Sequence, residues 1–130
     1  HALRGLVKAG DPRALRLLGY DPDLALTARL QLPASVRIGD KLALGADLQG
    51  AQGARVLVDY ALTFQRAGGK TSTKVFKWKT GSLGADGLSL QKSHPLKAQA
   101  STFTLLPGAH QVTLMVNGVP RAEGEVELLA

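Results

Sequence analysis

The chain has 130 residues, a net charge of +6 and no cysteine. This length suits one domain with its own core, and the missing cysteines exclude a disulfide scaffold, thiolate metal sites and a cysteine nucleophile. A hydrophobic fraction of 45% with 20% charged residues is typical of a globular protein, and no apolar run is long enough to suggest a membrane span or a membrane partner.

The first part of the chain predicts two short helices joined by a tight turn. Apolar residues recur at helical spacing up to Gly10, which is a typical helix stop. Asp11 and Pro12 then match the N-cap and the first position of a second helix, which should end near Gly19. Helices this short need a neighbour to pack on, and helix pairs are the unit of repeat solenoids. We therefore interpret residues 1–20 as the end of an upstream helical-repeat domain, and the chain, which does not begin with Met, as a piece of a longer protein.

From residue 24 onward, alternation of apolar and polar residues predicts β-strands. Asn117-Gly118 is a tight-turn signal between the last two strands, and no strand–helix alternation suggests a parallel sheet. The expected fold of residues 24–130 is an immunoglobulin-like antiparallel β-sandwich of seven or eight strands, so that the chain is mainly β with a short N-terminal helix pair. The expected strands cover residues 24–32, 41–49, 54–65, 73–80, 87–92, 110–116 and 119–128.

The excess positive charge is concentrated in residues 66–97, where seven basic residues face a single acid, Asp86. A patch of this sign favours polyanions, and the stretch "KTSTKVFKWK" interleaves lysines with two aromatic residues. Alternate residues of a strand lie on opposite faces, so Phe76 and Trp78 are predicted to be mostly buried and Lys77 to point outward with Lys79. Two interpretations stay open: an outer strand face that contacts phosphates, or a core strand whose lysines are only solvated. The candidate nucleic-acid-binding residues are Arg66, Lys70, Lys74, Lys77, Lys79, Lys92 and Lys97.

No catalytic group can be assembled from the sequence. His94 is expected in a loop before Pro95, and His110 is expected in a structural corner with Pro107 and Gly108 at the start of a strand. No metal-binding spacing, phosphate loop, dinucleotide fingerprint or nucleophile elbow is present. The alternating glutamates of the last strand are expected to form a solvated face. We therefore assign no catalytic residue, no cofactor and no metal, and predict that the chain is not an enzyme by itself.

Several stretches together resemble a known family. The helix pair "HALRGLVKAGDPRALRLLGY" runs into "VLVDYALTFQRAGGKTSTKVFKWKT", followed by "QKSHPLK" and "LPGAHQVTLMVNG". This arrangement resembles the C-terminal region of bacterial DNA-alkylation-repair-like proteins, in which HEAT-like helical repeats precede a β-sandwich. The resemblance implies a cytoplasmic protein whose longer parent chain is glycosylase-like, with base-excision residues in repeats that lie outside this chain.

Two classes of function follow. The first is a non-catalytic accessory domain of a DNA-alkylation-repair-like protein, which assists DNA binding weakly through phosphates or caps the upstream helical-repeat domain of the same chain. The alternative is a protein-interaction or carbohydrate-binding Ig-like module unrelated to DNA. The spatial distribution of the lysines discriminates between DNA contact and the other roles, and an aromatic-lined groove would favour sugar binding.

Overall fold

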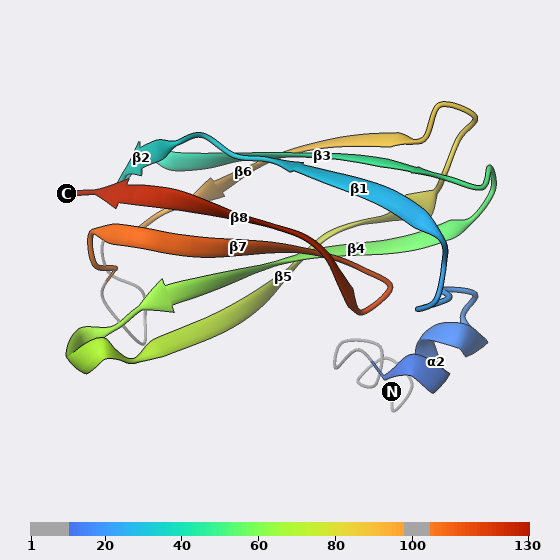
Figure 1. Cartoon of the computed structure of the whole chain (residues 1–130), viewed down its shortest axis with the longest axis horizontal. Coiled ribbons are helices and arrows are strands. Elements are labelled where there is room, and N and C mark those ends of the chain that lie inside the picture. The colour runs from blue at the N-terminus through green and yellow to red at the C-terminus, as the bar shows by residue number, and fades with distance from the viewer. Residues whose placement is uncertain (1–10, 98–104) are drawn as a thin grey trace.

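The computed structural model describes residues 11–97 and 105–130, which form two β-sheets packed face to face with a short helix at one end (Figure 1). The three-stranded sheet has the order β1-β3-β6 and the five-stranded sheet the order β2-β8-β7-β4-β5. This confirms the predicted mainly β, immunoglobulin-like sandwich, while the first of the two expected helices lies outside the described residues. The described elements are α2 (Pro12–Leu17), β1 (Leu26–Gln31), β2 (Ser35–Arg37), β3 (Lys41–Gly50), β4 (Arg55–Gln65), η1 (Ala67–Gly69), β5 (Thr71–Ser82), β6 (Leu88–Pro95), β7 (Gly108–Val116) and β8 (Val119–Leu129).

The core lies between the two sheets and follows directly from the alternation in the sequence. Strand β3 of the smaller sheet buries Leu42, Leu44 and Leu48, each at most 1% exposed. From the larger sheet, Val112 and Leu114 of β7 are fully buried against them. Each such aliphatic side chain contributes about 2 kcal/mol through removal from water, so the two faces hold each other without any covalent link.

Strand β4 is buried on its inner face and over part of its outer face, because α2 covers part of the outer face of its sheet. Leu57 points away from the sandwich core, yet it is only 4% exposed, since it packs with Leu15 and Tyr20. Helix α2 begins as the sequence predicts: Pro12 is its first residue, and the Asp11 carboxylate accepts hydrogen bonds from two backbone N–H groups of the first turn. A six-residue helix is not stable alone, so its packing on the sheet maintains it.

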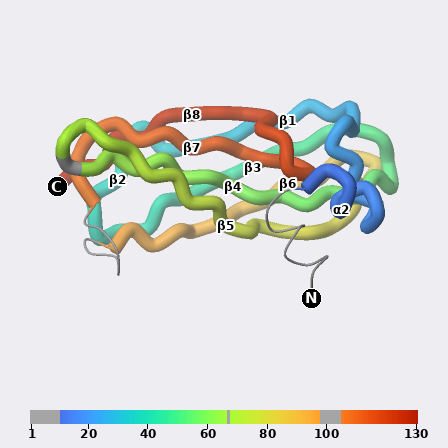
Figure 2. Tube along the Cα trace, turned by 90° about the horizontal axis from the view of Figure 1, so that it is seen from below, coloured from blue at the N-terminus to red at the C-terminus, as the bar shows by residue number. Residues whose placement is uncertain are grey.

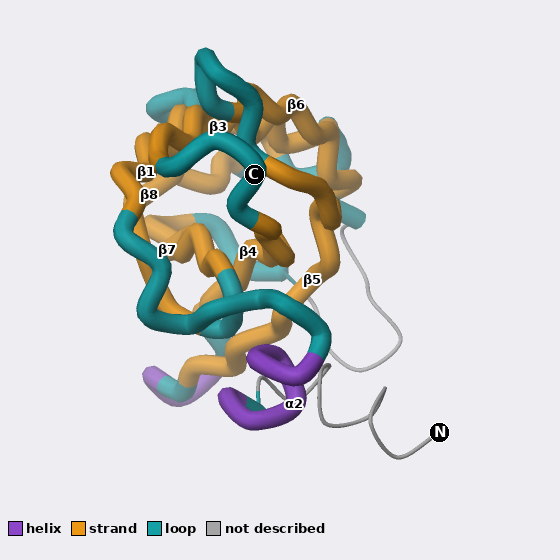
Figure 3. Tube along the Cα trace, turned by 90° about the vertical axis from the view of Figure 1, so that its right-hand side faces the viewer, coloured by secondary structure: helices purple, strands orange, loops and turns teal. Residues whose placement is uncertain are grey.

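Strands β5 and β6 end their sheets on the same margin of the sandwich, opposite β1 and β8 (Figures 2 and 3). Their side chains meet between the sheets, where the rings of Phe76 and His94 lie 4.6 Å apart between centroids. The sequence placed His94 and Pro95 in a loop, but both belong to β6. A proline is tolerated there because β6 is an edge strand, which needs no hydrogen bond on its outer side.

A β-bulge interrupts the pairing of β5 with β4. Lys77 is paired with Asp59 and Lys79 with Val58, so Trp78 is the extra residue of β5. The predicted exposure of Lys77 and Lys79 is confirmed, but the bulge places Lys79 opposite Val58 and not on the outer face beside Lys77. The backbone of Lys79 is opposite a fully buried valine, and its side chain is exposed because β5 is the edge of the sheet.

The same bulge and the edge position explain the burial of the two aromatic residues of β5. Phe76 and Trp78 face the core, as predicted, and both contact Tyr60. They are half-buried and not mostly buried, however, since nothing in the described residues continues the sheet beyond β5. After the bulge, the inward positions change from even to odd residues, which is why Leu83 is only 2% exposed.

One strand was not predicted, and one predicted turn is confirmed. The short strand β2 pairs in parallel with the end of β8, because the chain crosses from the smaller sheet to the larger one after β1. The remaining strand pairs are antiparallel. Asn117 and Gly118 both have positive φ, 52° and 79°, as a tight hairpin turn between β7 and β8 requires.

Candidate nucleic-acid interface

Five lysines from the two sheets lie along the margin that β5 and β6 form, and we call them the basic margin. They are Lys74, Lys77 and Lys79 of β5, Lys92 of β6 and Lys97, which follows β6. All five are exposed. With about 3.3 Å per strand residue, the three lysines of β5 span about 17 Å, which corresponds to about five base steps along one DNA strand.

The other two predicted basic residues extend the basic margin at the turn between β4 and β5. Arg66 precedes η1, and its Nη1 donates a hydrogen bond to the hydroxyl of Ser72 at 3.1 Å. Lys70 follows η1 and is exposed. The turn itself requires glycine, because Gly68 and Gly69 have φ values of 79° and 76°.

A hollow of about 170 Å³ opens on the basic margin and brings Lys74 and Lys97 together. Its walls are mostly apolar and aromatic, and among the described residues that line it there is no carboxylate or amide side chain. A lysine ammonium is a compact positive charge suited to an anion, whereas recognition of sugar hydroxyls relies on precisely placed hydrogen-bonding groups. The remaining lining residues are Phe64, Phe76, His94, Pro95, Leu96 and Leu105.

Behind this hollow, Tyr60 and His94 form a hydrogen-bonded pair between the sheets. The Tyr60 hydroxyl lies 2.7 Å from Nδ1 of His94. Burial lowers the pKa of His94, with a further lowering by the positive charge of Lys92, and burial raises the pKa of Tyr60. Both shifts favour the neutral forms, between which the hydroxyl and Nδ1 share one hydrogen bond. The pair therefore orients the aromatic wall of the hollow.

Lys77 also interacts with a partly buried acid on the outer face of the larger sheet. Burial raises the pKa of Asp59, and the positive charge of Lys77, its cross-strand neighbour, lowers it. Burial has the larger effect, so the pKa of Asp59 is raised overall. The acid is thus compensated only in part by Lys77, whose ammonium group remains exposed toward solvent.

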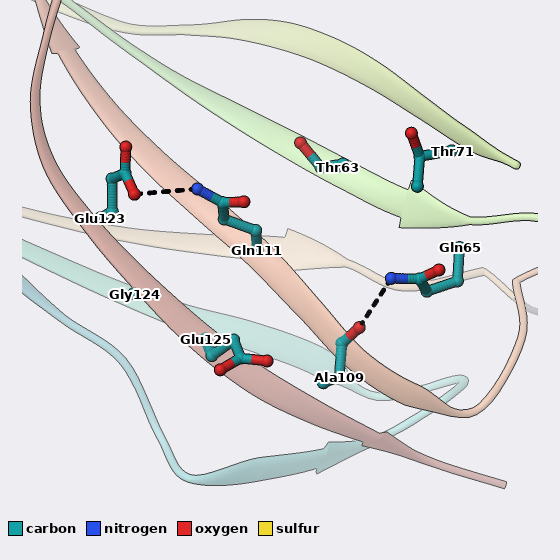
Figure 4. A pocket seen from close by; sticks show the side chains of 8 residues that line it. All are labelled: Thr63, Gln65, Thr71, Ala109, Gln111, Glu123, Gly124 and Glu125. Atoms are coloured by element: carbon teal, nitrogen blue, oxygen red, sulfur yellow. Dashed lines mark hydrogen bonds between the residues drawn. The ribbon is translucent and has the colours of Figure 1, made fainter. Parts of the chain in front are cut away.

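The outer face of the larger sheet has the opposite character (Figure 4). A wide hollow of about 650 Å³ lies over β5, β4, β7 and β8. Its described lining consists mostly of polar and acidic side chains and includes no aromatic residue. Two hydrogen bonds cross it, from Gln111 Nε2 to Glu123 Oε2 at 3.0 Å and from Gln65 Nε2 to the carbonyl of Ala109 at 3.4 Å. The glutamates of β8 repel a polyanion, and the face offers no ring on which a sugar or a base could stack.

The predicted corner lies away from the basic margin, at the start of β7. Gly108 has φ 130°, a conformation that favours glycine. Nδ1 of His110 donates to the carbonyl of Gly108 at 2.9 Å, and its ring packs on Phe64 with the side chain 4% exposed. Pro107 precedes the strand and is exposed. His110 therefore stabilises the backbone conformation at the start of β7.

Within residues 11–97 and 105–130, no three histidine or acidic side chains gather in a way that could hold a metal ion. In the same residues, no helix combines the length and apolar character needed to cross a membrane. The sequence did not indicate the hydrogen bond between Tyr60 and His94, because the two residues are 34 positions apart and lie on different sheets.

A two-sheet sandwich of this topology with a basic margin defines the chain as an Ig-like domain. The family described as "Uncharacterised protein YhaZ, C-terminal Ig-like domain" matches residues 27–130, and the chain belongs to this family. The uncharacterized protein YhaZ of Bacillus subtilis (strain 168) is 29% identical over 121 residues, which are 91% of this chain and 34% of that protein. The chain thus spans about a third of the length of this curated relative.

Solved structures that are similar to the chain include an alkylpurine DNA glycosylase and a β-glucosidase. Pseudomonas fluorescens alkylpurine DNA glycosylase AlkC, bound to DNA containing an abasic site analog, matches 100% of this chain and 37% of its own length with 32% identity and a TM-score of 0.86. DesR, a β-glucosidase from Streptomyces venezuelae in complex with D-glucose, matches 82% of this chain and 15% of its own length with 13% identity and a TM-score of 0.51. The second likeness reflects the fold alone.

Proposed function

We propose that this chain is a non-catalytic accessory domain of a DNA-alkylation-repair-like protein, and that its basic margin lies along the phosphate backbone of DNA. The observation that carries the proposal is the meeting of lysines from both sheets on one margin, Lys74 with Lys97 in one hollow. The 32% identity with AlkC over the whole chain supports the link to alkylation repair. In this role the parent chain acts in the cytoplasm and supplies base excision from a part outside this chain.

The charge distribution supports one orientation on DNA. The basic margin lies at the β5 end of the larger sheet, and the acidic residues Glu123, Glu125 and Glu127 lie two strands or more away on β8. A polyanion is attracted by the first group and repelled by the second. Lysines act as point charges without the planar fork of arginine, so the contact is with phosphates, is weak and is indifferent to base sequence.

The alternative of a carbohydrate-binding module is disfavoured by the same geometry. The polar hollow of the outer face has no aromatic residue, and the aromatic hollow of the basic margin has lysines where hydrogen-bonding amides or carboxylates would be needed. The likeness to DesR, at 13% identity, supplies only the fold. The described surface therefore fits an anionic partner better than a neutral sugar.

Nuclear magnetic resonance tests the proposal directly. An isotope-labelled sample of the chain is titrated at low salt with a DNA duplex of about 12 base pairs. We expect backbone amide shifts at Lys77 and Lys92 and none at Glu125, which lies on the acidic face. Shifts confined to the acidic face, or no shift at any amide, would exclude the basic margin as a DNA contact.

Capping of an upstream helical domain is a second role that one observation favours. Leu17 of α2 is 78% exposed, although the helix buries Leu15 completely on the other side. Leu17 is thus available for contact with a preceding helix of the parent chain, since neighbouring helices of a repeat array cover each other's apolar faces. In the longer parent chain, Leu17→Ser should lower the melting temperature of the helical part. In the present chain alone, the same change should leave the melting temperature unchanged. If the parent chain melts at the same temperature with and without the substitution, the capping role is contradicted.

A further inference from the structure

The segment that joins α2 to β1 is held by side chains of the sandwich through its own backbone. Four carbonyl groups between residues 18 and 24 accept hydrogen bonds from an arginine of β4, an asparagine of the β7–β8 turn and an arginine of β8. The bonds run from Arg55 Nη1 to the Leu18 carbonyl, from Asn117 Nδ2 to the Asp21 carbonyl at 2.8 Å, and from Arg121 Nη2 to the Pro22 carbonyl at 3.1 Å and the Leu24 carbonyl at 2.7 Å.

Asn117 is the centre of this network and cannot turn away from it. The residue is 0% exposed. Its Oδ1 accepts from the backbone N–H of Leu57 at 2.8 Å, and its Nδ2 also reaches the carbonyl of Arg55 at 3.3 Å. Every polar atom of the amide is therefore engaged, with β4 on one side and the connecting segment on the other.

Arg55 holds the segment a second time through Tyr20. Its guanidinium carbon lies 4.6 Å from the centre of the Tyr20 ring, and its Nη2 lies 3.2 Å from the tyrosine hydroxyl. Glycine is favoured at position 19, because its φ is 86° and a Cβ there would make a tight contact of 3.1 Å with Arg55 Nη1. The end of α2 thus fits against Arg55 in one position.

From this network we propose that Arg55, Asn117 and Arg121 are positioning residues that make residues 11–25 and the sandwich one rigid body. Apolar packing of Leu15 and Leu57 keeps α2 on the sheet but is non-directional. Hydrogen bonds to four carbonyls of the connecting segment add direction, because each is sensitive to angle. The backbone at residue 11 is then held in one orientation relative to the basic margin. This inference stands whether or not the basic margin binds DNA.

Distance measurements between spin labels test the rigidity, and the absence of native cysteines makes the labelling specific. The reporting pair is Arg13→Cys on α2 with Ala109→Cys at the far end of β7, and the reference pair is Ala85→Cys with Ala109→Cys, both within the sandwich. We expect one narrow distance distribution for each pair in the otherwise unchanged chain. A broad distribution for the reporting pair in that chain would overturn the proposal at once.

The decisive variant is Arg55→Met with Arg121→Met, which keeps both unbranched stems and the Asn117 turn but removes three of the four carbonyl bonds. We expect the reporting pair to broaden and the reference pair to stay narrow. The hydrogen-bonded amides of Tyr20 and Leu24 should exchange with solvent at least about 10-fold faster, while those of β4 and β7 remain unchanged. If the distance distribution of the reporting pair stays narrow in this variant, packing alone fixes the helix. If amide exchange accelerates equally in β4 and β7, the two arginines only stabilise the whole domain. Either result contradicts the proposal.

Discussion

Replacing the three lysines of β5 should remove most of the salt dependence of DNA binding. If three or four phosphates are neutralised along the basic margin, the logarithm of the binding constant falls with the logarithm of the salt concentration with a slope near −3. Between about 50 and about 200 mM salt this slope corresponds to an affinity loss of about 60-fold. In Lys74→Gln/Lys77→Gln/Lys79→Gln, at most about one of these contacts remains, so the loss should shrink to about 4-fold.

A matched control removes the same charge elsewhere. Arg13, Arg29 and Arg37 are exposed on α2, β1 and β2, away from β5. Replacing all three with Gln lowers the net charge by the same amount but leaves the basic margin intact. Fluorescence anisotropy of a labelled duplex, recorded at several salt concentrations, measures both slopes, and circular dichroism checks that each variant is folded.

The comparison between the two variants decides the question. We expect the control variant to keep a slope near −3, because long-range charge affects affinity less than direct phosphate contacts do. Equal flattening in both variants would mean that only the net charge matters. A β5 variant that binds like the unchanged chain, or an unchanged chain that does not bind at low salt, would refute the basic margin as an interface.

Three further predictions concern stability and catalysis. Trp78→Ala should lower the free energy of unfolding by about 2 kcal/mol, less than the usual 3–5 kcal/mol for a fully buried tryptophan because the ring is half-buried; urea denaturation that shows no change would place Trp78 outside the packed core. The pKa of His94 is lowered in the folded chain, so below the ordinary histidine pKa near 6.5 the unfolded chain binds a proton more readily. The stabilising contribution of neutral His94 is therefore complete above that pH and is lost as the pH falls below it. His94→Gln should reduce the dependence of the unfolding free energy on pH between about pH 6.5 and 5, and an unchanged dependence would contradict a buried, neutral His94. The purified chain should release no alkylated base from damaged DNA, and release that is lost in His94→Gln or His110→Gln would show that it is catalytic.

The sequence by itself determined the elements that depend on neighbours in the chain. The alternation in β3 and β4 predicts their buried faces, and Asp11 with Pro12 predicts the start of α2, because a cap and a strand face are set within a few residues. Asn117-Gly118 likewise predicts a hairpin turn from backbone conformation alone. Alternation together with regularly spaced turn residues likewise predicts an Ig-like sandwich of seven or eight strands, and the resemblance to a family with a C-terminal sandwich agrees with this fold.

Only the tertiary structure decided which residues from distant parts of the chain come together. The basic margin exists because β5 and β6 end two different sheets on one side, and strand order is set by packing of whole faces, not by local pattern. The bulge that places Lys79 opposite the buried Val58 depends on the register of β5 with β4. Asn117 was visible as a turn residue, but its bond to Asp21, 96 positions away, is available only once the sheet has brought the two ends of the domain together.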